Sequence, residues 1–135
     1  MSTNELAPEL DRDPETVYSG LREGNLSSAY LDEQGELQRN FTPEVFVNED
    51  SHLEYPLNAQ RELAGTHSES HFEWGYTGSG PRLLSVSLLA DAYDEDELAV
   101  EYGNEFKNGV VADLDRTEDF QLQAKDIDDF IQELD

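Results

Sequence analysis

Short runs of alternating apolar and polar residues fill the first half of the chain and predict β-strands. Residues 16–22 and 26–31 are two such runs, and the turn-forming residues 23–25 between them predict a β-hairpin. Gly35 predicts a second turn. Further extended segments are expected at residues 36–41, 45–47 and 53–55, the last ended by Pro56.

Helical spacing replaces this alternation in the second half. Residues 57–71 hold few large apolar side chains and are expected to form a long loop. Residues 81–93 are apolar on most faces, which is typical of a buried helix, and Pro81 suits its first turn. A second helix is predicted over residues 98–114, because apolar residues recur there every four positions: Leu98, Tyr102, Phe106 and Val110.

The junction between these helices and the end of the chain carry further signals. Asp94 and Glu97 have the spacing of a capping box at the start of the second helix. Phe120 and Leu122 suggest a short extended segment. A terminal amphipathic helix is predicted, because four apolar residues would share one face: Ile127, Phe130, Ile131 and Leu134.

Together these elements predict an α+β domain, with a small N-terminal antiparallel sheet or set of hairpins packed on about three C-terminal helices. Residues 1–14 lack any apolar period and are expected to form a flexible arm. Residues 15–135 would then make a single domain of ordinary size.

The net charge of the chain indicates the environment in which the protein works. The chain has 135 residues, of which 32 are acidic and 8 basic, for a net charge of -24, and both halves of the chain share the excess. Only two of the basic residues are Lys. Molar salt screens such repulsion, and it penalises the long apolar stem of Lys. We therefore expect a haloarchaeal or similarly salt-adapted cytoplasmic protein that carries monovalent salt cations at its surface.

The same composition bears on partners and compartment. Direct nucleic-acid binding is not expected, because such affinity rests on basic residues that contact phosphates. The chain holds no Cys, which rules out a disulfide framework or a cysteine zinc site. It shows neither a signal peptide nor an apolar run long enough for a membrane span. A soluble protein without membrane association is expected.

The most distinctive segment is FEWGYTGSGP at residues 72–81, followed by LLSVSLLADAY and by a terminal helix that opens at Asp126. These motifs resemble DUF6166, a domain-of-unknown-function family from bacteria, archaea and mobile elements. The similarity covers about residues 15–134 and is most specific at residues 72–92. The resemblance implies a small α+β domain and carries no activity. The family commonly has a Trp and a Thr before the last helix, where Phe120 and Gln123 stand here, which implies a weaker cap.

The same segment offers the best candidate for a ligand site. A glycine-rich loop before a helix can present backbone N–H groups to a phosphate, but Arg82 is the sole nearby cation and Glu73 is close in sequence. Packing of an aromatic strand over residues 72–76 against the buried helix is the favoured interpretation. The candidate ligand-binding residues are Trp74, Tyr76, Gly78, Ser79, Gly80 and Arg82.

Other candidate sites are weaker. His67 and His71, with His52 as a third, lack the helical context and the carboxylate of a familiar metal site. The acidic run that includes Asp91 lacks the spacing of a calcium loop. We therefore assign no metal, no cofactor and no catalytic residue.

Three functions remain open at this point. The first is a non-enzymatic protein-interaction or accessory domain with an unknown protein partner. The second is an acidic nucleic-acid mimic, with carboxylates in rows on one face. The third is a small-ligand binder or enzyme that uses residues 74–82.

Overall fold

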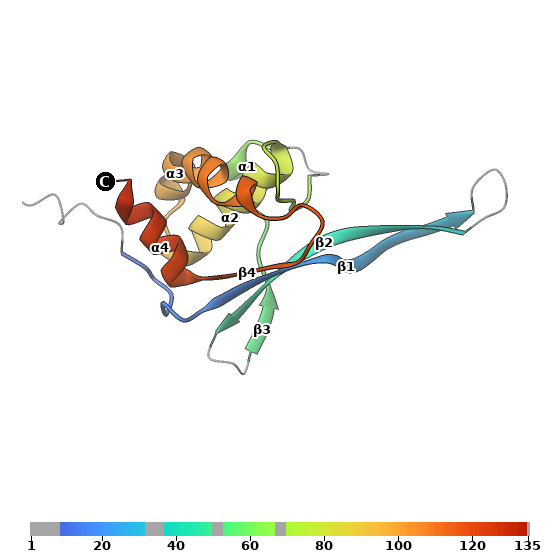
Figure 1. Cartoon of the computed structure of the whole chain (residues 1–135), viewed down its shortest axis with the longest axis horizontal. Helices are drawn as coiled ribbons and strands as arrows, with labels where there is room; N and C mark the ends of the chain where they lie inside the picture. The colour runs from blue at the N-terminus through green and yellow to red at the C-terminus, as the bar shows by residue number, and fades with distance from the viewer. Residues whose placement is uncertain (1–8, 32–36, 50–52, 67–69, 135) are drawn as a thin grey trace, which may run out of the picture.

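The fold was obtained as a computed structural model that describes residues 9–31, 37–49, 53–66 and 70–134. For residues 22–31, 37–42, 49 and 53, only the backbone is described. Helices cover one side of a four-stranded antiparallel sheet (Figure 1), with the strand order β3-β2-β1-β4. The predicted α+β class is confirmed. The strands are β1 (Val17–Leu31), β2 (Leu37–Glu49), β3 (Leu53–Pro56) and β4 (Phe120–Gln123).

The predicted hairpin over residues 16–31 is wrong, because β1 is one continuous strand that pairs with β2. Residues 22–24 interrupt the register between the Leu21↔Glu44 and Asn25↔Thr42 pairs. This glycine-containing triplet therefore forms an irregularity within a strand rather than a turn. The turn predicted at Gly35 lies outside the described residues. The extended segments around Val45 and Leu53 are confirmed as parts of β2 and β3.

The helical half follows the predicted order. The helices are α1 (Arg61–Ala64), α2 (Ser79–Tyr93), α3 (Asp96–Gly109) and α4 (Ala124–Glu133), with the 3-10 turn η2 (Val111–Asp113) after α3. The segment expected to be one long loop therefore contains a helical turn, α1. The second predicted helix ends five residues early, because the chain turns at Val110 into η2.

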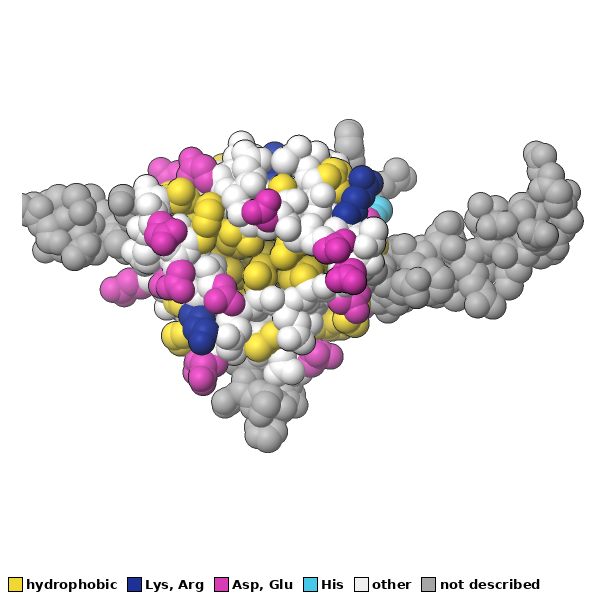
Figure 2. Space-filling view, in the orientation of Figure 1, with side chains coloured by type: hydrophobic (Ala, Val, Ile, Leu, Met, Phe, Trp, Pro, Cys, Tyr) yellow, Lys and Arg dark blue, Asp and Glu magenta, His cyan; other side chains and the backbone are white. Residues whose placement is uncertain are grey.

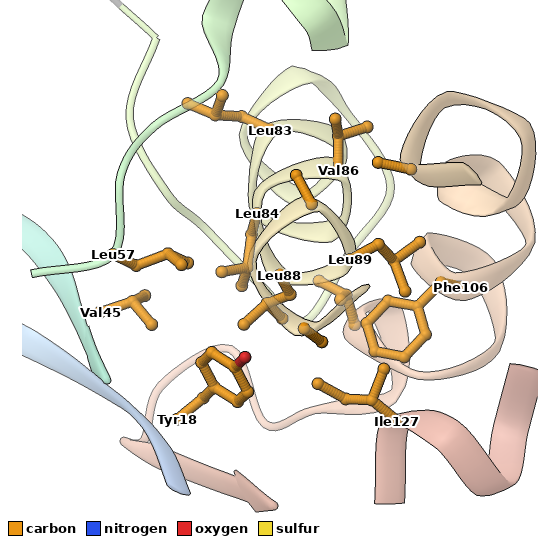
Figure 3. Packing of buried hydrophobic residues seen from close by; sticks show 14 of the residues in the cluster. Tyr18, Val45, Leu57, Leu83, Leu84, Val86, Leu88, Leu89, Phe106 and Ile127 are labelled. Carbon is orange, nitrogen blue, oxygen red and sulfur yellow. The ribbon is translucent and has the colours of Figure 1, made fainter. Parts of the chain in front are cut away.

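Helix α2 is the centre of the core, as its apolar composition predicts. Leu83, Leu84, Leu88 and Leu89 are completely buried. Figure 3 shows α2 between two groups of side chains. Tyr18, Val45 and Leu57 lie on one side and Phe106 and Ile127 on the other, all of them members of the core.

The α2–α3 junction corrects the predicted capping box. Asp94 ends α2 in the left-handed conformation, with φ of 53°, and its N–H donates to the Ala90 carbonyl at 2.9 Å. Glu95 occupies the N-cap position of α3 and makes no side-chain capping bond. A two-residue connection leaves Asp94 to close one helix, so it cannot cap the next. The acids in the first turn of α3, Asp96 and Glu97, still face its positive end.

The terminal helix matches its predicted face in part. Ile127 and Ile131 are buried, and the half-buried ring of Phe130 meets Phe106 edge to face at 5.7 Å between centroids. Leu134 is 39% exposed beyond the end of α4. The start of α4 is capped, because the Gln123 N–H donates to Asp126 Oδ2 at 3.0 Å. Within the described part of the chain, no helix combines the length and apolarity needed to cross a bilayer.

Candidate functional site

The segment at residues 71–78 is irregular rather than the strand predicted over 72–76, and Trp74 anchors it in the core. The Trp74 ring is fully buried and meets Phe120 edge to face at 4.7 Å between centroids. Its Nε1–H donates to the Glu118 carbonyl at 2.8 Å. The Phe120 ring in turn lies so close to Gly20 that a Cβ there would be 2.0 Å from it. Trp74 therefore joins this segment to β4 and β1.

Gly75 and Gly80 allow close backbone packing. Gly75 has φ of 86°, and its N–H donates to the Val111 carbonyl at 2.9 Å. A Cβ at Gly75 would lie 2.5 Å from the Arg116 Cα, and one at Gly80 would lie 2.7 Å from Glu73 Cβ. These short distances support the packing interpretation of the glycines.

The remaining candidate residues lie at or near the start of α2. Tyr76 is half-buried beneath the Arg116 guanidinium, 4.4 Å from the ring centroid, in a cation–π contact. Gly78 is the N-cap of α2 in an extended conformation, and the exposed Ser79 is the first helical residue.

Arg82, the cation considered for a phosphate, bridges three helices. Its Nε donates to the Ala64 carbonyl at the end of α1, and its Nη1 donates to Asn104 Oδ1 on α3, each at 2.7 Å. The structure thus brings the predicted residues together at one end of α2, with observed packing roles for Trp74, Tyr76, Gly80 and Arg82. A ligand role for them stays a prediction.

The histidine and acid candidates are scattered. His71 lies 3.7 Å from a Glu73 carboxylate oxygen, whereas His52 and His67 lie outside the described residues. No group of three His, Cys, Asp or Glu side chains suited to a metal ion occurs among the residues that the structure describes.

A partly buried polar cluster that the sequence did not reveal joins the N-terminal segment to α2. The Arg12 guanidinium donates to both Asp91 carboxylate oxygens, at 2.8 and 3.0 Å, and the Tyr18 hydroxyl donates to Asp91 Oδ2 at 2.7 Å. Burial and the Asp91 charge raise the pKa of Tyr18 well above its ordinary value. The backbone N–H groups of Asp11 and Arg12 also donate to the Ala92 carbonyl.

The most unusual feature of the fold is a two-stranded ribbon, which we define as residues 21–31 of β1 and 37–44 of β2. β4 pairs with β1 as far as Gly20, and β3 pairs with β2 from Phe46 onward. Beyond these positions β1 and β2 pair with each other and project past the helical layer (Figure 1). The eight residues of β2 correspond to a length of roughly 26 Å, and the longer β1 segment covers the same length because the register shifts add residues to it.

Strand alternation gives this ribbon two unlike faces. Along β2, positions 41, 39 and 37 fall on the same face as the buried Val45 and Val47. Their partners in β1 are positions 26, 29 and 31. Five of these six positions are apolar, and the set is Leu26, Ala29, Leu31, Leu37, Arg39 and Phe41. The other face carries polar residues, with Glu44 nearest the helical body and the following uncharged residues beyond it: Asn25, Ser28, Tyr30, Gln38, Asn40 and Thr42.

The ribbon also differs from the rest of the chain in its formal charge. It holds two acidic residues, Glu23 and Glu44, and two basic residues, Arg22 and Arg39, so its formal charge is zero. The net charge of -24 is therefore carried by the other residues. Three of these acids follow in the connecting residues 32–36, which lie outside the described residues. Figure 2 shows further acidic side chains spread around an apolar centre on one face of the helical body.

Comparison with known proteins gives a family. A family model described as "Family of unknown function (DUF6166)" matches residues 34–133. The chain therefore belongs to this family, as the residues around Trp74 suggested. No curated protein and no solved structure matches it.

Proposed function

We propose that this chain is a non-enzymatic protein-interaction domain of a salt-rich cytoplasm, and that the β1–β2 ribbon is its binding element. The observation that carries the proposal is the ribbon itself. The core-facing side of the sheet continues along β2 from Val45 to positions 41 and 37, beyond the reach of the helices in Figure 1.

An isolated two-stranded ribbon is marginally stable in water unless a third strand or a packed layer supports it. An apolar strip on a soluble domain typically marks an interaction site. The ribbon meets both conditions, because β3 and β4 pair only with the parts of β1 and β2 that lie outside it, and its apolar positions extend past α2. A partner that covers the strip would provide the missing layer.

Salt supports this role. Molar salt shortens the screening length to about 3 Å and strengthens the burial of apolar surface. The acidic body is suited to molar salt. In that medium the neutral ribbon would therefore bind its partner by apolar contact. The scarcity of Lys supports the same environment, and a haloarchaeal source is part of the proposal.

A ribbon-deleted variant tests the proposal. Residues 23–42 would be replaced by Asn-Gly, a sequence that favours a two-residue hairpin turn, so that the buried Pro43 is retained. Both chains would be immobilised and exposed in 2 M KCl to an extract that also contains the full chain. We expect the full chain to retain a stoichiometric protein and the variant to lose it. Equal retention by both chains, or retention by neither, would contradict the proposal.

One observation favours the nucleic-acid mimic as a second candidate. Glu97, Glu101 and Glu105 are exposed and four residues apart on α3, so they form one row with a rise of about 6 Å per step. A mimic would compete with DNA for a basic nuclease or repair protein. The ribbon-deleted variant would still compete, because the row lies on α3, and this result would separate the two candidates.

A further inference from the structure

We infer that the ribbon binds a second copy of this chain, with the apolar faces of two antiparallel ribbons packed against each other. The inference rests on the proposed function, because it takes the ribbon to be the binding element. It adds the identity of the partner and the relative orientation of the two chains.

The first argument is self-complementarity. A two-fold axis places one patch against the same patch of the partner. The apolar face of the ribbon is suited to this, since five of its six positions are apolar. Leu26 and Phe41 face each other in the register near the middle of the ribbon. A two-fold axis near this pair would place apolar residues of both copies at the centre of the contact.

The second argument is electrostatic. Two copies of a chain with a charge of -24 repel each other, and the repulsion is weakest where the approaching surfaces carry no net charge. The ribbon is such a surface. Antiparallel packing also sends the two helical bodies to opposite ends of a contact roughly 26 Å long. That separation exceeds the screening length of about 10 Å at 0.1 M salt. A parallel arrangement would instead bring the bodies together.

The third argument concerns size. Two ribbons about 26 Å long, each two strands wide, offer a contact smaller than a standard specific interface, in the range of weak and transient ones. The dimer should therefore dissociate on dilution. Its affinity should rise with salt, because salt screens the repulsion between the bodies and strengthens apolar burial.

Sedimentation equilibrium of the full chain in 2 M KCl tests the inference. We expect a reversible monomer–dimer equilibrium, which the ribbon-deleted variant lacks. Phe41→Asp places a charge on the apolar face and should weaken the dimer by at least ~100-fold. Thr42→Asp adds the same charge at the next position on the opposite face and should change the dimer constant by less than ~3-fold. The fluorescence of the buried Trp74, which is the sole Trp, reports whether each body is folded.

Cross-linking gives an independent test of the face, because the chain has no Cys. Ala29→Cys and Ser28→Cys change neighbouring small residues that alternation assigns to opposite faces. A short bis-maleimide should join two copies of the Ala29→Cys chain in 2 M KCl and leave the Ser28→Cys chain without a cross-link. Equal cross-linking of both variants would overturn the face-to-face arrangement.

The remaining outcomes separate this inference from the proposed function. A full chain that is monomeric at 100 µM in 2 M KCl, or a Phe41→Asp variant that dimerises like the parent, would overturn self-association. If the ribbon is still required to retain a different protein, the proposed function stands. If the ribbon-deleted variant retains that protein as well, the proposed function fails too.

Discussion

Arg12 and Asp91 form a two-pronged ion pair, in which Nη2 lies 2.8 Å from Oδ1 and Nε lies 3.0 Å from Oδ2. Both side chains are mostly buried, and they are 79 residues apart in the sequence. Tyr18 donates a third hydrogen bond to the same carboxylate. The pair therefore fastens the N-terminal segment and β1 to the last turn of α2.

We predict that Asp91→Asn lowers the free energy of unfolding by about 2 kcal/mol, because a charged acceptor of three hydrogen bonds is lost. Asp94→Asn is the matched control. Asp94 is exposed, and its left-handed conformation is one that Asn adopts readily. Urea unfolding in 2 M KCl, followed by Trp74 fluorescence, measures both variants. Equal effects would mean that the loss reflects acidic charge in general rather than this cluster.

The positive φ of Gly75 predicts a second pair of effects. Gly75→Ala should destabilise the domain by about 3 kcal/mol, because the left-handed backbone becomes strained and the new Cβ meets Arg116. Gly65→Ala carries similar strain at φ of 72° and has nothing within 4 Å of its Cβ, so we expect a loss of about 1 kcal/mol. Urea midpoints compare the two. Equal losses would show that steric crowding at Gly75 is relieved by movement of Arg116.

Local patterns predicted most elements of the body, because their signals depend on nearby residues. The buried character of α2 and the four-residue spacing along α3 are both evident in the sequence. The β1–β2 pairing was missed, because a glycine within a strand and a glycine in a turn have the same local signature until the long-range partner is known. The actual partner of Leu21 is Glu44, not a residue of the next short run.

For the candidate site, the sequence predicted which segment is distinctive but not the long-range contacts that its residues make. The aromatic segment was correctly selected as distinctive, and the structure gives Trp74 a packing role. The contacts of Arg82 with Ala64 and Asn104 come from separate helices, so no local pattern could have shown them. The ribbon could have been suspected from one signal, the scarcity of acidic residues over positions 21–31 and 37–44.

Two buried tyrosines predict a loss of stability at alkaline pH. Burial, followed by a hydrogen bond to an aspartate, raises the pKa of Tyr93, and burial with the nearby Asp91 raises that of Tyr18. In the unfolded chain each phenol loses its proton at about pH 10, whereas the folded chain retains it. Stability is therefore full below pH 10 and should fall above it, by up to about 1.4 kcal/mol per pH unit for each tyrosine.

Chemical unfolding between pH 9 and 11 at constant ionic strength measures this decline. The Tyr18→Phe variant should be less stable at pH 8, because Asp91 loses a hydrogen bond. Its stability should then fall less steeply above pH 10, because one titrating group is absent. A slope identical to that of the parent chain would show that Tyr18 does not govern the alkaline transition.

Salt dependence is the last prediction and concerns the acidic body. The melting temperature should rise between 0.2 and 3 M KCl, and the domain should loosen or unfold below about 0.5 M, because unscreened like charges oppose the compact state.

Glu101 gives a local test, since it lies four residues from both Glu97 and Glu105 on the exposed side of α3. Glu101→Gln should stabilise the domain by about 0.5 kcal/mol at 0.5 M KCl, where like charges at this spacing repel. The gain should vanish at 3 M KCl, where the screening length is shorter than the value of about 3 Å at 1 M. Thermal melts of the parent chain and the Glu101→Gln variant across the salt series measure the difference. A melting temperature that does not change with KCl would contradict the interpretation of the acidic surface as an adaptation to salt.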